Sequence, residues 1–152
     1  MIAPMNDDEL QITPATLGDL ADIRSLLMAC SLPLDGLAQH WRTFLIARAE
    51  GRPIGCGGAE AYPFAALIRS IAVAPEYRGR GVGRKLVRHL LDRLSARGLR
   101  EFYLLTTDAE PYFQRRGFRR IEWDEVNPQI LSSTQFQGAC PRSATCMRLV
   151  MR

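Results

Sequence analysis

The chain has 152 residues, 47% of them hydrophobic and 24% charged, a balance that suits one folded domain over residues 1–152 and excludes a disordered chain. The N-terminal MIAPMNDDEL lacks the parts of a secretory signal, and no apolar run reaches the roughly 18 residues of a membrane span, so we expect a cytoplasmic protein with no membrane partner. The net charge is +4, and the positive charge is concentrated in two basic blocks, 78–100 and 115–120, which suit a compact polyanion as well as they suit a nucleic acid.

The first part of the chain predicts a strand followed by two helices. Residues 10–14 have the character of a short opening strand. Thr16 begins a helix as its N-cap, and Asp19 three positions later makes a variant of the capping box. Apolar residues then recur at helical spacing as far as Cys30, and a second short helix covers 34–40.

The middle of the chain predicts three strands and a long helix. The strands cover residues 44–49, 54–62 and 66–74, and a tight turn at 50–53 joins the first two. A glycine-rich loop then leads into an amphipathic helix, whose core-facing residues recur every four positions: Val82, Leu86, Leu90 and Leu94. Gly98 ends this helix as its C-cap.

The last part of the chain predicts three strands and one short helix. The strands cover 102–107, 118–123 and 145–151, and the helix covers 109–116. The whole order predicts an α+β (mixed α/β) fold with a central, mostly antiparallel sheet, one βαβ crossover and flanking helices. Residues 124–146 are a candidate contact for a homodimer.

The loop Arg-Gly-Arg-Gly-Val-Gly at 78–83 carries the strongest signal for binding. Its glycines allow positive φ and a close approach of the backbone to a ligand. The first amides of the following helix lack internal partners and the helix dipole adds positive charge, so they can cradle a diphosphate. Arg84 stands where both a P-loop and a dinucleotide fingerprint require glycine, which excludes those two motifs. The alternative is a plain turn into a helix, with solvated arginines.

Three stretches of the sequence together resemble one known family. Residues 78–83 match an Arg/Gln-x-x-Gly-x-Gly/Ala signature, Ser70–Val73 with Pro75 and Tyr77 match the strand before it, and residues 114–118 resemble a later helix-to-strand junction. These features resemble the GNAT acetyltransferases, and the resemblance covers roughly residues 10–123. It implies an N-acetyltransferase that uses acetyl-CoA as co-substrate.

The resemblance also implies where acetyl-CoA binds. It lies in a V between two parallel central strands that splay apart, which on this chain are 66–74 and 101–107. Backbone groups of the first strand hydrogen-bond the pantetheine arm like an added strand, and loop amides hold the diphosphate. The implied coenzyme-binding residues are Ile71, Ala72, Val73, Arg78, Gly79, Arg80, Gly81, Val82, Gly83, Arg84 and Phe113.

Two subgroups of the family look similar to different parts of the chain. Residues 104–118 resemble the acetyltransferase domain of bacterial N-acetylglutamate synthases. Residues 29–33, 67–73 and 140–147 resemble arsenic-resistance-type N-acetyltransferases. The acceptor implied is therefore the amine of a small molecule, either an amino acid or an arsenic-containing analogue.

The residues for proton transfer are less clear from the sequence. The family acid that protonates the leaving thiolate is a Tyr four residues before the junction glycine, where this chain has Phe113. Tyr112 is its neighbour, but one step along a helix turns a side chain by about 100°, so packing is the alternative role for it. Thr107 or water could protonate the thiolate instead. Glu60 is the candidate general base, since Leu67 and Arg69 occupy the family positions.

Arg69 and Cys30 are candidate acceptor-binding residues. An Arg in an apolar central strand is costly to bury unpaired, so Arg69 either clamps an oxyanion of the acceptor or pairs with Glu60 or Asp35. Cys30 could gather with Cys140 and Cys146 around a soft atom of the acceptor, the alternative being scattered thiols. None of the four cysteines forms a Cys-x-x-Cys pair, and we predict no metal site.

Two other functions compete with catalysis. The missing Tyr at position 113 and the missing strand carboxylate favour a non-catalytic acyl-CoA-binding sensor or interaction module. Nucleic-acid binding through the basic blocks is the other. Because no aromatic stacking stripe accompanies those arginines, we expect no nucleic-acid partner.

Overall fold

Seven strands form one sheet in the computed structural model, which describes residues 3–6 and 8–151. Their order across the sheet is β1-β2-β3-β4-β5-β7-β6, and neighbouring strands are antiparallel except β4 and β5, which are parallel. The strands are β1 Leu10–Pro14, β2 Leu45–Ala49, β3 Arg52–Ala61, β4 Ala65–Val73, β5 Glu101–Thr106, β6 Arg119–Ile121 and β7 Thr145–Val150. The parallel strands β4 and β5, joined by the connection that contains α3, form the predicted βαβ crossover.

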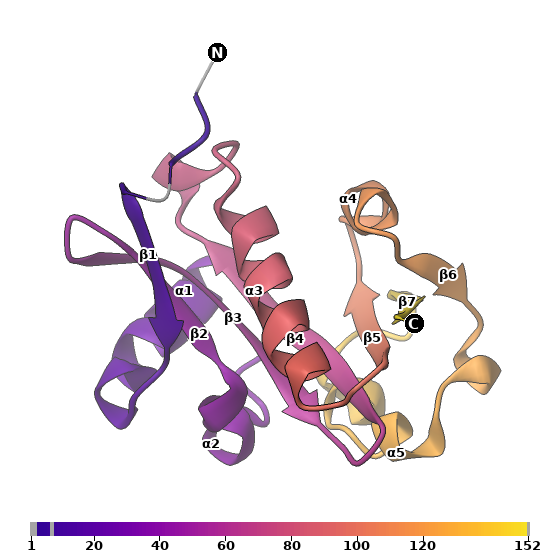
Figure 1. The fold of residues 1–152 in the computed structure, drawn as a ribbon. Helices are drawn as coiled ribbons and strands as arrows, with labels where there is room; N and C mark the ends of the chain where they lie inside the picture. The colour runs from indigo at the N-terminus through magenta and orange to yellow at the C-terminus, as the bar shows by residue number, and fades with distance from the viewer. Residues whose placement is uncertain (1–2, 7, 152) are drawn as a thin grey trace.

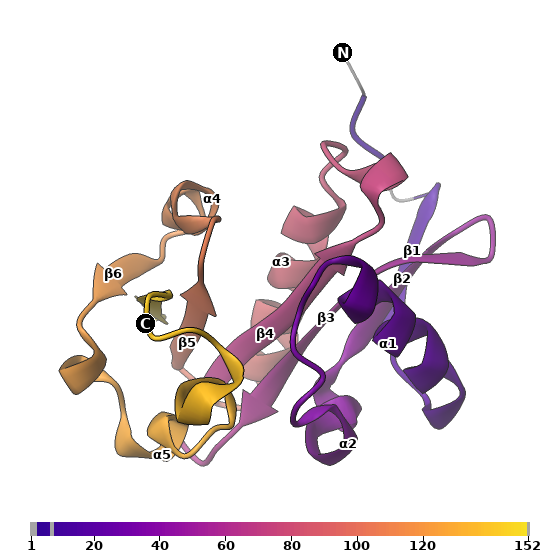
Figure 2. The same cartoon turned by 180° about the vertical axis from the view of Figure 1, so that it is seen from behind.

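Helices cover both faces of this sheet. They are α1 Leu20–Ala29, α2 Leu37–His40, α3 Val82–Ala96, α4 Glu110–Arg115 and α5 Pro128–Leu131. Helix α3 lies across one face of β2–β4, and α1 and α2 lie on the other (Figures 1 and 2). No helix in the described ranges is long and apolar enough to cross a membrane.

The predicted elements are confirmed except near the C-terminus. The strand predicted at 118–123 is wrong in length, because a 3₁₀ turn at Trp123–Glu125 ends the pairing after Ile121. Between the last two predicted strands lie two elements that the sequence reading did not include, α5 and a short irregular helix at Gln135–Ala139. Neither is long enough to show a periodic apolar pattern in the sequence.

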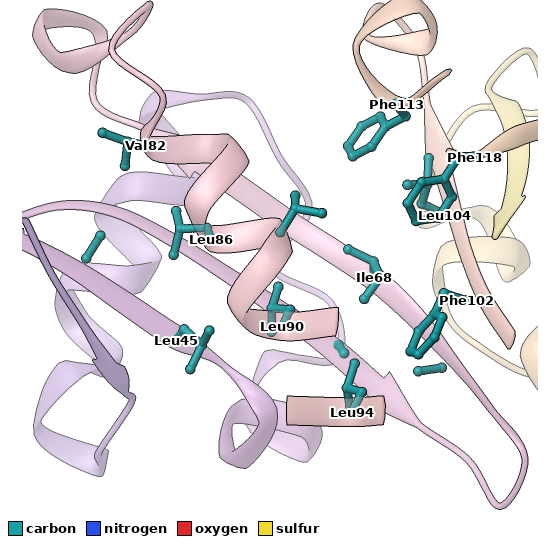
Figure 3. Close-up of a cluster of buried hydrophobic side chains, with 14 of the residues drawn as sticks. Leu45, Ile68, Val82, Leu86, Leu90, Leu94, Phe102, Leu104, Phe113 and Phe118 are labelled. Carbon is teal, nitrogen blue, oxygen red and sulfur yellow. The ribbon is translucent and has the colours of Figure 1, made fainter. Parts of the chain in front are cut away.

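The face of α3 that packs on the sheet is the one the four-residue repeat predicts. Val82, Leu86, Leu90 and Leu94 are all buried and share one core with Leu45 of β2 and Ile68 of β4 (Figure 3). The same core continues through Phe102 and Leu104 of β5 to Phe113 of α4 and to Phe118 (Figure 3). This apolar contact joins the halves of the molecule on either side of the parallel pair.

Strands β4 and β5 separate after a short parallel contact. They pair only from Ala65 opposite Glu101 to Leu67 opposite Tyr103. Beyond that point β4 bends, because Ser70 and Ile71 together oppose the single residue Gly57 of β3, which is a β-bulge. Ser70 has φ +61°, an uncommon value for a residue other than glycine. The bulge therefore directs the second half of β4 away from β5, as Figure 1 shows.

The predicted capping box starts a 3₁₀ turn at Leu17–Asp19, which leads directly into α1. The Thr16 amide and hydroxyl donate hydrogen bonds to the Asp19 carboxylate, at 2.8 and 3.1 Å. Asp19 also pairs with Arg48 of β2. The hydrogen bond from the Thr16 backbone, helped by Arg48, lowers the pKa of Asp19 below its ordinary value of 3.8, against the opposing effect of burial.

Replacing Asp19 by Asn should lower the free energy of unfolding by about 1 kcal/mol at pH 7. Because the folded-state pKa is depressed, the stabilisation is present above the ordinary pKa and is lost as the pH falls through the lowered value. The difference between wild type and Asp19→Asn should therefore shrink near pH 3 in urea unfolding. Asp22→Asn, an exposed change on the same helix, should cost less. An equal loss at both pH values would contradict the role of the carboxylate.

Candidate active site

The second half of β4 presents an open edge toward β5. Ala72 pairs with Cys56 of β3, and the Ala74 amide donates to the Ile54 carbonyl at 2.8 Å. Since backbone groups alternate along a strand, those of Ile71 and Val73 face the opening instead. This edge can accept an extended ligand as an additional strand.

The glycine-rich loop joins this edge to the N-terminus of α3. Gly79 and Gly81 have φ values of +76° and +82°, and no described atom lies within 4 Å of where a Cβ on either would stand. The Lys85 amide closes the first turn on the Gly81 carbonyl at 3.1 Å. The amides of Val82–Arg84, which precede that bond, are the free donors of a helix start. With the helix dipole they form a site for an anion.

Two of the three arginines predicted to bind phosphate contact the protein itself. Arg78 donates from Nε to the Val73 carbonyl at 3.1 Å, and its Nη2 lies 3.4 Å from the Cys30 sulfur. Arg80 donates to the Ala3 carbonyl at 3.2 Å and lies 3.5 Å from Glu9. Arg84 is exposed in the first turn of α3.

A cavity of about 470 Å³ lies between the diverging strands. Residues of β4 and β5 line its two sides, and the segments 31–33 and 139–141 line the rest. Of the residues predicted for the site, it contains Arg69, Ile71, Thr107 and Phe113. Glu60, Tyr112 and Cys30 do not line it.

Arg69 and Glu60 form a buried ion pair beside this cavity. The Arg69 Nη1 to Glu60 Oε2 distance is 2.7 Å, and both side chains are 1% exposed. Arg69 also donates from Nε to the Ser70 hydroxyl at 2.9 Å and from Nη2 to the Pro33 carbonyl at 3.4 Å. Of the two roles predicted for Arg69, the structure has the pair with Glu60. Because the Glu60 carboxylate already pairs with the guanidinium, this arrangement disfavours the other role, a clamp for an oxyanion of the acceptor.

The Glu60 carboxylate has two further neighbours. The Tyr62 hydroxyl donates to Oε1 at 2.8 Å, and His40 Nε2 lies 3.6 Å from the same oxygen. Burial, followed by the contact with Glu60, raises the pKa of Tyr62 to about 12. Tyr62 therefore remains a donor near neutral pH. Both oxygens of Glu60 are engaged, which disfavours direct proton abstraction by the predicted base.

Asp108 is the carboxylate among the described residues that line the cavity. It is exposed at the end of β5, beside Thr107. The sequence could have indicated Asp108 as a site residue by its position directly after a central strand, because residues that follow such a strand gather at the edge of the sheet.

The side chains of Tyr112 and Phe113 point in different directions, as expected for neighbouring positions on helix α4. Phe113 lines the cavity and packs edge-on against Phe118, with ring centroids 5.7 Å apart. The Tyr112 hydroxyl instead lies 3.6 Å from the point where a Cβ on Gly83 would stand, beside the first turn of α3.

The cysteines do not gather around an acceptor. Cys140 lines the cavity and donates to the Gln135 side chain at 3.0 Å, whereas Cys30 donates to the Val73 carbonyl at 3.6 Å. Cys146 is buried elsewhere, and burial raises its pKa to about 12. The thiols are therefore scattered, which is the alternative to a cluster that the sequence left open. No group of three or more potential metal ligands occurs within residues 3–6 and 8–151.

Together these parts define a class of protein. An open strand edge, a glycine-bent loop and a free helix N-terminus suit an elongated ligand that carries a diphosphate, and the adjoining cavity suits a small second substrate. This is the arrangement expected of an enzyme that transfers a group from a nucleotide-containing coenzyme.

Comparison with known proteins identifies the family. Residues 18–118 match the acetyltransferase (GNAT) family. An uncharacterized N-acetyltransferase of Chlorobaculum tepidum is 32% identical over 119 residues, which cover 78% of this chain and 74% of the relative. The chain belongs to the GNAT acetyltransferase family, which confirms the predicted fold class and the predicted enzyme class.

Other relatives are longer than this chain. An amino-acid acetyltransferase of Ralstonia nicotianae is 30% identical over 123 residues, which cover 74% of this chain but only 27% of that protein. The structure of N-acetylglutamate synthase from Neisseria gonorrhoeae, complexed with coenzyme A and N-acetyl-glutamate, matches with a TM-score of 0.81. That match has 23% identity and covers 94% of this chain and 35% of the other, so it supports the fold.

Breaking the buried ion pair should destabilise the protein strongly. Arg69→Met leaves the Glu60 carboxylate buried without its cation, and the expected loss is about 3–5 kcal/mol. The double variant Glu60→Gln/Arg69→Met should recover part of this loss, which urea unfolding would measure as a coupling energy. Arg120→Met, which breaks an exposed 3.8 Å contact with Glu110, is the control and should cost under about 1 kcal/mol. A single-variant loss no larger than this control would contradict the structural role of the pair.

Proposed function

We propose that this chain transfers the acetyl group of acetyl-CoA to the amine of a small molecule, with an amino acid as the first candidate acceptor. The observation that carries the proposal is that a strand edge, a helix N-terminus and a cavity adjoin one another. The open edge of β4 runs into the N-terminus of α3 at one end and borders the 470 Å³ cavity at the other.

The coenzyme would bind along that edge. Backbone groups of Ile71 and Val73 would hydrogen-bond the pantetheine arm, and the amides of Val82–Arg84 would hold the diphosphate. The thioester would then lie at the cavity, which Ile71 lines and Val73 does not, so the Ile71 amide is the candidate donor to its carbonyl oxygen. Arg78 would exchange its hydrogen bond to the Val73 carbonyl for one to the ligand.

The proton chemistry would use residues that reach the cavity. Asp108 is the candidate to accept the proton of the attacking amine, either directly or through water. Glu60 could take part only by way of its present partners. Phe113 has no proton to give to the leaving thiolate, so Thr107 or water supplies it.

An amino-acid acceptor is supported by the similarity to the amino-acid acetyltransferase of Ralstonia nicotianae. Arg69 lines the cavity and is paired with Glu60, so its contribution would be to position Ser70 and Pro33 around the acceptor. None of the three similar proteins described above is named for arsenic. The arsenic-containing analogue is accordingly the second candidate acceptor, and Cys140 is the thiol that could contact it.

The proposal is tested by thiol release from acetyl-CoA across a panel of amines that includes glutamate, other amino acids and arsenical and phosphinic amino acids. Turnover with at least one amine is expected. Gly81→Ala should weaken coenzyme A binding by about tenfold or more, since a methyl group there would obstruct a charge-assisted amide–phosphate contact.

A matched control exists in the β2–β3 turn. Gly51 also has positive φ, +75°, and open space at its Cβ position. Gly51→Ala should therefore lose similar stability but leave coenzyme A binding unchanged. If coenzyme A stabilised the protein without any thiol release, the chain would be a non-catalytic acyl-CoA-binding module. Absence of both binding and release would refute the proposal entirely.

Asp108→Asn should lower kcat by about 100-fold near neutral pH, because it removes the proton acceptor. The loss should be smaller at higher pH, where more of the free amine is already unprotonated. Steady-state rates between pH 6.5 and 9.5 would measure this, with the exposed Asp92→Asn on α3 as control. A loss that is independent of pH, or no loss, would exclude Asp108 as the base.

A further inference from the structure

Tyr112 and Arg116 each contain a buried polar atom without a partner. The Tyr112 hydroxyl and the Arg116 Nε have no hydrogen-bond partner in the part of the chain that the structure describes. The two residues are four positions apart at the end of α4, and the Arg116 guanidinium lies over the Tyr112 ring, 5.4 Å from its centroid. Because leaving such a group unpaired costs about 1–3 kcal/mol, two of them four positions apart call for a physical reason.

The Tyr112 hydroxyl reaches across from α4 to the coenzyme edge. It lies 3.6 Å from the Cβ position of Gly83, the second residue of α3. The side chains of Val73 and Ile71 approach the same point, at 3.7 and 3.9 Å. The hydroxyl is therefore located where the edge of β4 meets the free amides of α3.

Positive charge also converges on this hydroxyl. Burial raises the pKa of Tyr112, and the charges of Arg116, Arg84 and Arg115 oppose the rise, which places all three guanidinium groups within electrostatic reach. None of the three is in an ion pair with a described acidic residue. Like charges gathered in this way repel one another, and an anion between them would relieve the repulsion.

We propose that Tyr112 and Arg116 bind the diphosphate of the coenzyme from α4, opposite the amides of Val82–Arg84. This inference rests on the proposed function. The hydroxyl of Tyr112 and the Nε of Arg116 donate to diphosphate oxygens, which satisfies both unpaired atoms. Tyr112 is then a coenzyme-binding residue and not the proton donor to the thiolate, since its hydroxyl lies at the diphosphate end of the site. The bound coenzyme joins α3 to α4 across the opening between β4 and β5.

The role differs from plain packing in a measurable way. Tyr112→Phe keeps the ring and removes only the unpaired hydroxyl, so the melting temperature of the free protein should stay the same or rise. The Kd for coenzyme A in calorimetric titration should increase about tenfold, the effect of one hydrogen bond to a charged group. A packing role predicts no change in Kd.

Arg116→Gln should raise the Kd for coenzyme A by about tenfold or more and should flatten its dependence on salt concentration. Arg119→Gln, an exposed change of the same charge on β6, is the matched control and should leave both quantities unchanged. A Kd for Tyr112→Phe within twofold of wild type would overturn the inference. So would an equal loss of affinity in Arg119→Gln, since that would indicate only long-range charge.

The outcomes also separate this inference from the proposed function. If wild-type protein binds coenzyme A and the variants bind it equally well, the assignment of Tyr112 and Arg116 fails alone. If wild-type protein gives no heat with coenzyme A at low ionic strength, the proposed function fails and this inference with it.

Discussion

The site depends on one constraint, the separation of β4 from β5 after three residue pairs. The bulge at Ser70 produces it by turning the second half of β4 away from its parallel neighbour. The apolar core that runs from α3 to Phe113 and Phe118 keeps both halves attached despite the separation (Figure 3). Because β3 pairs with the second half of β4, the backbone groups at the opening are already held in a strand, and a ligand need not order them on binding.

Much of the fold could be predicted because its long elements have strong periodic patterns. The four-residue repeat from Val82 to Leu94 indicated both the helix and its buried face. The bulge could not be predicted in the same way, because serine is not typical of positive φ. The short elements after Trp123 were missed because four or five residues are too few to show a period.

In the candidate site, the coenzyme-binding loop could be predicted better from the sequence than the residues around the cavity and on α4. Glycine spacing and the family resemblance indicated the loop, since backbone geometry there requires particular residue types. The sequence left Arg69 with two possible roles, a clamp for an oxyanion or one member of an ion pair. It does not show whether an acidic residue, Glu60 or Asp35, lies beside the guanidinium. Tyr112 was considered for proton transfer because it neighbours the family position. Its actual place beside Gly83 depends on how α4 packs against α3, which spacing alone does not fix.

The hydrogen bond between Arg78 and the Val73 carbonyl has a consequence for the free protein. A strand edge that is open to a ligand is equally open to a strand from another molecule, and such edges promote aggregation. A charged side chain bonded to that edge makes it a poor template for intermolecular pairing. Arg78 would therefore hinder self-association of the ligand-free protein. A bound ligand would replace Arg78 and would then cover the same edge.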